Sequence, residues 1–154
     1  MSISRWVVIP DLQVPDHDQR VVDEVIEYIA GRAGEFTGLL CVGDELDSPE
    51  PSRWNKGYAG EFAPTLQKSI DKCHTILERL HWAVGYDKPF HLMRSNHGER
   101  IAKYVARFAP ALGSLKALDY ETLLGLDEIG ITYHTEPFEF APNWVLAHGD
   151  EGSL

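Results

Sequence analysis

Residues 39–47 read LLCVGDELD, and this stretch decides the fold. The unbroken apolar run 39–42 has the length and composition of a buried β-strand. It stops at Gly43 and is followed by two acids, Asp44 and Asp47. The same pattern, an apolar run that ends in polar side chains, recurs along the chain.

Further buried strands are predicted at residues 5–9 (RWVVI), 90–93 (FHLM) and 144–147 (WVLA), with additional strands at 131–134 and 138–140. Apolar residues at helical spacing predict helices over 21–29, from Pro64 to Val84, and over 101–108. Asp16 and Asp18 are candidate N-caps of the first helix, and residues 111–126 are helix-leaning but weakly patterned. Strand and helix alternate, which indicates an α/β domain whose sheet is at least partly parallel.

Composition places the chain among globular proteins. Its 154 residues are 44% hydrophobic and 25% charged, and they contain no repeat or linker, so residues 1–154 are expected to form a single domain. No apolar stretch approaches the roughly 18 residues of a membrane span. The short apolar N-terminus and two cysteines in apolar surroundings favour the cytoplasm. A net charge of −10 argues against a broad electrostatic grip on nucleic acid, although bound divalent cations would reverse the sign locally.

Polar side chains follow four of the predicted strands, and ligands of open α/β sheets bind beyond the carboxyl ends of the strands. They are Asp11 with Gln13, Asp44 with Asp47, Asn96 with His97, and His148 with Asp150. Taken singly, such residues more often cap helices or form turns. Four coincidences at one topological position favour a site for divalent cations such as Mn²⁺, Fe²⁺ or Zn²⁺.

A pair of ions would need a bridging carboxylate, and Asp44 is central enough to supply it. Two ions about 3.5–4 Å apart clamp a phosphoryl group and activate water for in-line attack. His97, next to a ligand but itself free, would protonate the leaving oxygen as general acid.

Four sequence blocks resemble the calcineurin-like metallophosphoesterases. GDELD (43–47) resembles their G-D-x-x-D block, and SNHGE (95–99) resembles G-N-H-[DE], with Ser95 for glycine and Gly98 inserted. PDLQ (10–13) stands where the family has D-x-H, and AHGD (147–150) resembles the strand-end histidine block. The blocks occur in the family's order and cover essentially the whole chain.

The resemblance implies a sandwich of two mixed β-sheets flanked by helices. It also implies that Asp11 binds one metal and that Asp44 bridges two. Asn96 and His148 would bind the second metal. His97 would be the acid near the phosphate, held by Asp47.

Two departures from the family pattern matter. Gln13 replaces a histidine, and an amide oxygen is a weaker ligand, so the first metal is expected to bind less tightly or to be a harder ion such as Mn²⁺ or Mg²⁺. D-x-Q, N-H-G-E-R and SRWNKGYAGEF (52–62) resemble phosphoesterases of tailed bacteriophages, which would place the protein in the host cytoplasm. No G-H-x-H occurs before Leu154, so the final strands and one ligand of each metal are expected to be missing. An unpaired sheet edge would then favour a homodimer.

Residues 47–62 form a long loop that carries Arg53, Trp54 and Lys56. The guanidinium of Arg53 suits a phosphate oxygen and the ring of Trp54 suits a base face. An equal alternative is a surface lid whose Trp54 packs on its own domain. Arg100, in a first helical turn, is expected to form a structural ion pair.

The leading hypothesis is a phosphoesterase that uses divalent metal ions, with Mn²⁺ favoured over Mg²⁺, Fe²⁺ and Zn²⁺. An alternative is that a single metal site is occupied. Its substrate would be a phosphodiester or phosphomonoester, with nucleotides and nucleic acid ahead of other esters. The alternatives are an inactive homologue that binds a host or phage partner, and a fragment of a longer enzyme.

Overall fold

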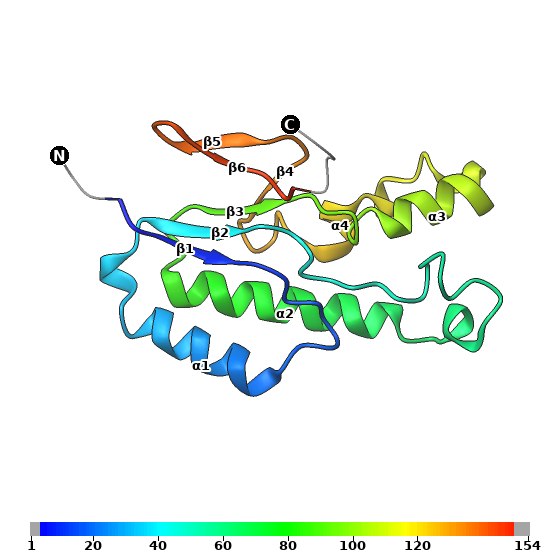
Figure 1. The fold of residues 1–154 in the computed structure, drawn as a ribbon, viewed down its shortest axis with the longest axis horizontal. Coiled ribbons are helices and arrows are strands. Elements are labelled where there is room, and N and C mark those ends of the chain that lie inside the picture. The colour runs from blue at the N-terminus through cyan, green and yellow to red at the C-terminus, as the bar shows by residue number, and fades with distance from the viewer. Residues whose placement is uncertain (1–3, 150–154) are drawn as a thin grey trace.

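The computed structural model describes residues 4–149 (Figure 1). The strands are β1 (Trp6–Ile9), β2 (Gly38–Cys41), β3 (Phe90–Met93), β4 (Thr132–His134), β5 (Phe138–Ala141) and β6 (Trp144–Leu146). The α-helices are α1 (Gln19–Ala30), α2 (Leu66–Val84), α3 (Arg100–Phe108) and α4 (Tyr120–Leu124). Short 3₁₀ helices are η1 (Ala33–Glu35), η2 (Ala59–Phe62), η3 (Pro110–Leu112) and η4 (Lys116–Leu118).

The first four strands form one sheet in the order β1-β2-β3-β4, and every neighbouring pair is parallel. Each step to the next strand moves in the same direction, so right-handed crossovers place α1 and α2 on the same face (Figure 1). The predicted α/β class is confirmed. This sheet is parallel throughout rather than mixed, because helical crossovers connect all of its successive strands.

The strands predicted at 138–140 and 144–147 form the antiparallel hairpin β5–β6. Figure 1 shows this hairpin on the face of the sheet opposite α1 and α2. In residues 4–149 the second layer of strands is this hairpin alone. β1 and β4 are the edges of the parallel sheet, and the homodimer expected through an open edge stays a prediction.

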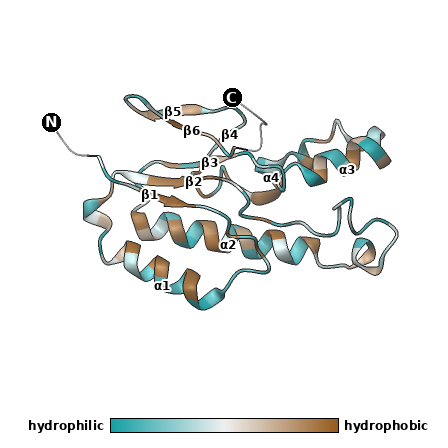
Figure 2. Ribbon diagram, in the orientation of Figure 1, coloured by the Kyte–Doolittle hydropathy of each residue, from teal (hydrophilic) through white to brown (hydrophobic). Residues whose placement is uncertain are grey.

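Alternation along the inner strands builds two apolar cores. Leu39, Cys41 and Leu92 face α1, α2 and α4 in the main core, whereas Leu40 and Met93 face the hairpin and pack with Leu146. Figure 2 shows the apolar sides of α1 and α2 turned toward the sheet. Each face of the sheet is therefore buried by a different kind of element, which explains why β2 reads as an unbroken apolar run.

Helix boundaries follow local chemistry. Of the two candidate caps, Asp18 is the N-cap of α1, because its carboxylate accepts from the backbone N–H groups of Arg20 and Val21 at 2.9 and 3.4 Å. α2 begins at Leu66, two residues after the expected Pro64, and the weakly patterned segment 111–126 contains η3, η4 and α4. No helix within residues 4–149 combines the length and hydropathy needed to cross a bilayer.

Candidate functional site

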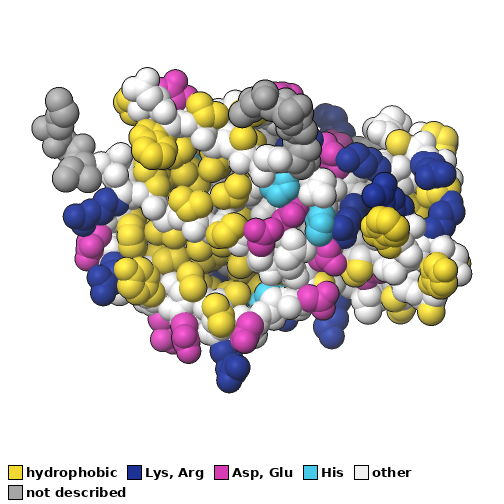
Figure 3. All heavy atoms as spheres, in the orientation of Figure 1, with side chains coloured by type: hydrophobic (Ala, Val, Ile, Leu, Met, Phe, Trp, Pro, Cys, Tyr) yellow, Lys and Arg dark blue, Asp and Glu magenta, His cyan; other side chains and the backbone are white. Residues whose placement is uncertain are grey.

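The carboxyl ends of β1, β2 and β3 lie at one edge of the sheet, because these strands are parallel and adjacent. The loop after β1 is tied to the loop after β2: the Gln13 N–H donates to the Asp44 carbonyl and the Val14 N–H to the Glu45 carbonyl, both at 2.9 Å. Figure 3 shows histidine and acidic side chains gathered near the middle of this view, between a broad apolar area and a group of Lys and Arg side chains.

Three predicted ligands converge at this edge. His148 Nε2 lies 3.2 Å from Asn96 Oδ1 and 3.5 Å from Asp44 Oδ1. The Nδ1 of His148 donates to the Val42 carbonyl at 2.7 Å, so its Nε2 carries a lone pair in the neutral ring. The cluster thus joins the ends of β2, β3 and β6. Asp150, the other acid of the AHGD block, lies outside the described residues.

Gly43 permits this close approach. Its φ of +97° favours glycine, and a Cβ there would stand 2.8 Å from the Ser95 Cβ and 2.9 Å from the His148 Nδ1. Ser95 is buried, and its hydroxyl accepts from the Gly98 N–H at 3.1 Å. Ser95 and Gly98 therefore close the turn that follows β3 with a hydrogen bond.

A second cluster contains Asp47, His97 and Arg100. Arg100 Nη1 donates to Asp47 Oδ1 at 2.8 Å, and its Nη2 donates to His97 Nε2 at 2.7 Å. His97 Nδ1 lies 2.9 Å from Asp47 Oδ1, outside hydrogen-bond geometry. An Nε2 that accepts from a guanidinium belongs to a neutral imidazole. In this arrangement His97 is held next to Asp47, but its Nε2 has no proton to give.

Asp11 and Gln13 come near the cluster through their backbone. Both adopt positive φ values, 45° and 53°, as does Asp44 at 55°. Such values are uncommon outside glycine, and they cluster at functional sites. Among residues 4–149, however, no hydrogen bond or ion pair joins the side chain of Asp11 or Gln13 to Asp44, Asn96 or His148.

The donor set suits one cation better than two. Within the described residues, no group of three or more His, Cys, Asp or Glu side chains is placed to hold a metal ion. The cluster supplies one carboxylate, one imidazole and the amide of Asn96. One of its oxygens, Asp44 Oδ1, is buried and has no hydrogen-bond partner among the described residues. That orphaned oxygen, facing a histidine lone pair, fits a bound cation.

Glu45 is a buried acid that the sequence did not single out. It occupies an x position of the G-D-x-x-D block and is fully buried, and the Tyr120 hydroxyl donates to its Oε1. Burial raises the pKa of Glu45 from its ordinary 4.5 to about 7, although the bond from Tyr120 acts in the opposite direction. In the sequence, the apolar Leu46 that follows Glu45 is the local signal that this loop packs inward, and Leu46 is buried in the structure.

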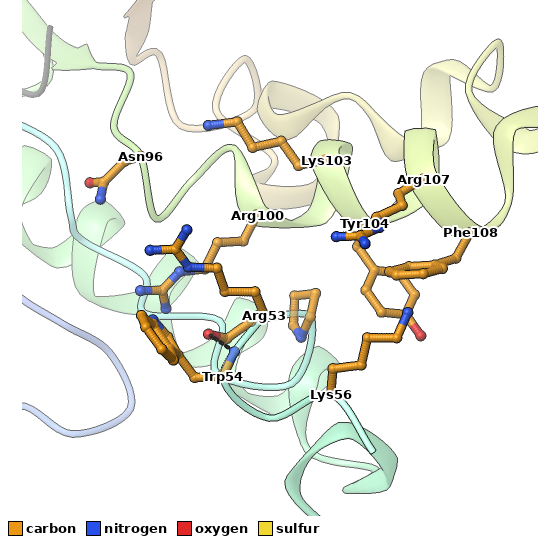
Figure 4. Close-up of a pocket in the computed structure, with 11 residues that line it drawn as sticks. Arg53, Trp54, Lys56, Asn96, Arg100, Lys103, Tyr104, Arg107 and Phe108 are labelled. Carbon is orange, nitrogen blue, oxygen red and sulfur yellow. Dashed lines mark hydrogen bonds between the residues drawn. The ribbon is translucent and has the colours of Figure 1, made fainter. Parts of the chain in front are cut away.

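A pocket of about 670 Å³ opens beside Asn96 and extends along α3. It is lined by Pro51, Ser52, Arg53, Trp54, Lys56, Asn96, Arg100, Lys103, Tyr104, Arg107 and Phe108. Figure 4 shows the loop side chains facing those of α3 across this space. Trp54 is 74% exposed, so the alternative in which this ring packs on its own domain is wrong.

No protein-family model matches the chain, and no solved structure matches it. The chain is 34% identical over 152 residues to the Gene 54 protein of Mycobacterium phage L5, and 34% identical over 151 residues to the Gene 54 protein of Mycobacterium phage D29. Each alignment covers 97% of this chain and 58% of the relative. The chain is therefore homologous to these bacteriophage proteins and spans about 58% of their length. Their name states no activity.

Proposed function

We propose that this chain is a metal-dependent phosphoesterase of the calcineurin-like type, which hydrolyses a phosphodiester or phosphomonoester of a nucleotide or nucleic acid. One observation carries the proposal. The Asp44 carboxylate, the Asn96 amide oxygen and the His148 Nε2 meet at the ends of three strands, within 3.5 Å of the histidine nitrogen.

With His148 neutral, these three atoms are electron-pair donors that face one another, and a cation between them would satisfy all three. The mixture of carboxylate, amide and imidazole favours Mn²⁺, with Mg²⁺, Fe²⁺ and Zn²⁺ as alternatives. A bound ion supplies Lewis acidity toward a phosphoryl oxygen. Asp11 and Gln13, whose backbone borders the cluster, are the residues we assign to a second and weaker cation position.

The remaining polar residues position the substrate and move a proton. Asn96 and Arg53 both line the pocket beside the cluster, where they would bind phosphate oxygens. Arg100 occupies the Nε2 of His97 in the free protein. An anionic phosphate offers Arg100 a stronger acceptor than an imidazole nitrogen, so substrate binding would release that nitrogen. The freed Nε2 would take a proton from solvent and give it to the leaving oxygen.

A second candidate function is a binding protein without catalysis. The contact between Arg100 and His97 favours it. While Arg100 donates to His97 Nε2, His97 holds no transferable proton at that atom and cannot act as a general acid. The donor set with one carboxylate, one imidazole and one amide would also bind a cation weakly. Activity separates the two candidates.

The test is hydrolysis of bis(p-nitrophenyl) phosphate with Mn²⁺ and with EDTA. Loss of general acid catalysis lowers rates by about 10²–10⁴-fold where the leaving group must be protonated. His97→Ala should therefore reduce the Mn²⁺-dependent hydrolysis of a dithymidine phosphodiester, whose leaving group is an alcohol, by on the order of 100-fold, and should affect bis(p-nitrophenyl) phosphate much less. His74→Ala is the matched control, because its Nδ1 bonds the Leu124 carbonyl at 2.7 Å, in the helical layer. No hydrolysis of either ester with Mn²⁺ above the rate in EDTA would reject catalysis and leave the binding protein.

Calorimetry with Mn²⁺ tests the cation site separately. Asp44→Asn removes the charge of the central ligand and keeps its size, so heat of Mn²⁺ binding should be lost. Asp87→Asn removes an equal charge from an exposed position between α2 and β3 and should leave binding intact. Equal Mn²⁺ affinity for the protein and Asp44→Asn would reject the assigned ligand.

A further inference from the structure

The pocket beside Asn96 concentrates positive charge in an acidic protein. The chain has a net charge of −10, yet five of its 14 Lys and Arg residues line this one space. They are Arg53, Lys56, Arg100, Lys103 and Arg107. Figure 3 shows Lys and Arg side chains gathered at the α3 end of the molecule, away from the broad apolar area. The net charge of the chain does not reveal that its positive charges cluster in this pocket.

Two of these cations are already neutralised. Arg100 pairs with Asp47 at 2.8 Å, and Lys103 pairs with Glu99 at 2.6 Å. The other three, Arg53, Lys56 and Arg107, form no ion pair within residues 4–149 and are exposed. They are available to an anion, although Lys56 also has an acid in its surroundings: a hydrogen bond from the Gly57 N–H and, more weakly, the charge of Lys56 lower the pKa of Glu61.

Aromatic rings alternate with these free cations. The Arg53 guanidinium lies 4.6 Å from the centre of the Trp54 ring, and the Lys56 ammonium lies 3.0 Å from the centre of the Phe108 ring. Trp54 is 74% exposed, so much of its ring surface is open, whereas the Phe108 ring is contacted by Lys56, Arg107 and Tyr104. A groove with exposed cations and an open tryptophan ring has the two features by which proteins hold single-stranded nucleic acid: phosphate attraction and base stacking.

The extent of the groove exceeds what one phosphate needs. At a rise of about 1.5 Å per residue, the stretch of α3 from Arg100 to Arg107 is about 10 Å long. The axial rise of a duplex, about 3.4 Å per phosphate of one strand, is a lower bound for a single strand, so this length spans more than one and no more than about three phosphates. Figure 4 places Arg53 and Trp54 near Arg100, and Lys56 near Phe108 at the far end. The two ends of the groove thus bring separate cations to separate phosphates.

We infer that this groove binds single-stranded nucleic acid across several nucleotides and leads its backbone to Asn96 at the candidate cation site. Duplex nucleic acid buries its base faces, so it cannot stack on the exposed ring of Trp54. A mononucleotide reaches one end of the groove only. The delivery of a phosphodiester for hydrolysis rests on the proposed function, whereas binding of the strand does not.

The experiment is fluorescence anisotropy with a labelled oligothymidylate of about 12 nucleotides, within the site sizes of single-strand binders. EDTA is present, so that binding is measured without cations and without cleavage. The triple variant Arg53→Gln, Lys56→Gln, Arg107→Gln should bind at least about tenfold more weakly, and its log–log salt slope should fall by about 2, at about 0.7 per phosphate contact. Trp54→Ala should weaken binding by about fivefold or more.

Arg32→Gln is the matched control. Arg32 lies beyond the C-terminal end of α1, outside the groove, and its guanidinium is also 4.6 Å from the centre of an aromatic ring, that of Tyr28. It should leave affinity and salt slope unchanged. Circular dichroism of each variant shows that it is folded. Equal affinity of the triple variant and the unaltered protein, or of single-stranded and duplex oligonucleotides, would overturn the inference.

Failure of this inference and failure of the proposed function give different results. No oligonucleotide binding in EDTA, with Mn²⁺-dependent hydrolysis of bis(p-nitrophenyl) phosphate retained, rejects the groove and keeps the phosphoesterase. Binding in EDTA that responds to the groove substitutions, without Mn²⁺-dependent hydrolysis, keeps the groove and rejects the phosphoesterase.

Discussion

Replacing Glu45 by glutamine should change the pH dependence of stability. The Glu45 side chain is fully buried, its Oε1 accepts from the Tyr120 hydroxyl, and its Oε2 has no partner among the described residues. Glutamine keeps the size and the acceptor for Tyr120, and it cannot ionise. The substitution therefore reproduces the protonated acid at every pH.

The magnitude follows from the pKa of Glu45, which burial raises from 4.5 to about 7. The folded protein holds this proton to a higher pH than the unfolded chain does. Its stabilising contribution is fully present below pH 4.5 and is lost as the pH rises through about 7. At about 1.4 kcal/mol per pH unit, the loss amounts to about 3 kcal/mol above that pH. Glu45→Gln should not lose this stability, because glutamine does not ionise.

The assay is urea unfolding, followed by tryptophan fluorescence, in EDTA at several values from about pH 5 to about pH 8. The free energy of unfolding of Glu45→Gln, relative to the unaltered protein, should rise with pH and level off. Glu24→Gln, which removes an exposed carboxylate from α1, controls for net charge and should change stability by less than about 0.5 kcal/mol. If the difference in the free energy of unfolding between Glu45→Gln and the unaltered protein stays constant with pH, Glu45 does not have a raised pKa in the folded protein.

Three further predictions concern the rest of the fold. Leu146→Ala, at a buried position that packs with the sheet, should lower the free energy of unfolding by about 2–3 kcal/mol in urea. Asp18→Ala should cost about 1 kcal/mol through loss of the α1 cap, whereas Asp18→Asn should cost less. Desolvation lowers the pKa of His91 and of His134, whose ring nitrogens lie 3.0 Å apart, so NMR titration should place both below 6.5. The stability that these neutral rings contribute is present above pH 6.5 and should fall as the pH drops through their folded pKa values.

The strand ends could be predicted from the sequence because a parallel sheet brings its carboxyl ends to one edge. That rule is enough to place Asp44 and Asn96 together, because they follow the neighbouring strands β2 and β3. His148 follows β6 of the antiparallel hairpin, and it reaches them because the hairpin packs on the sheet through Leu146. The rule does not predict the direction in which each side chain points. Asp11 and Gln13 sit at positive φ, and the direction of a side chain leaving such a turn depends on tertiary contacts that no periodicity encodes.

Glu45 and the basic groove were beyond sequence reasoning for a different reason. The burial of Glu45 depends on Tyr120, which lies 75 residues later in the chain. The groove depends on the direction in which α3 leaves the sheet, because that direction brings Arg107 opposite Lys56. A net charge of −10 is a sum, and a sum does not report where the positive charges lie.

Arg100 connects the two halves of the site. It lines the groove, and it also donates to Asp47 and to His97 Nε2. An anion that enters the groove competes with both of these acceptors for the same guanidinium. If Arg100 turns toward a phosphate, the Asp47 carboxylate loses a cationic partner and the His97 Nε2 loses its donor. Occupation of the groove and the contacts of Arg100 with Asp47 and His97 are then thermodynamically linked: a ligand that engages Arg100 weakens these contacts, and substitutions that weaken them raise the affinity of the groove for its ligand.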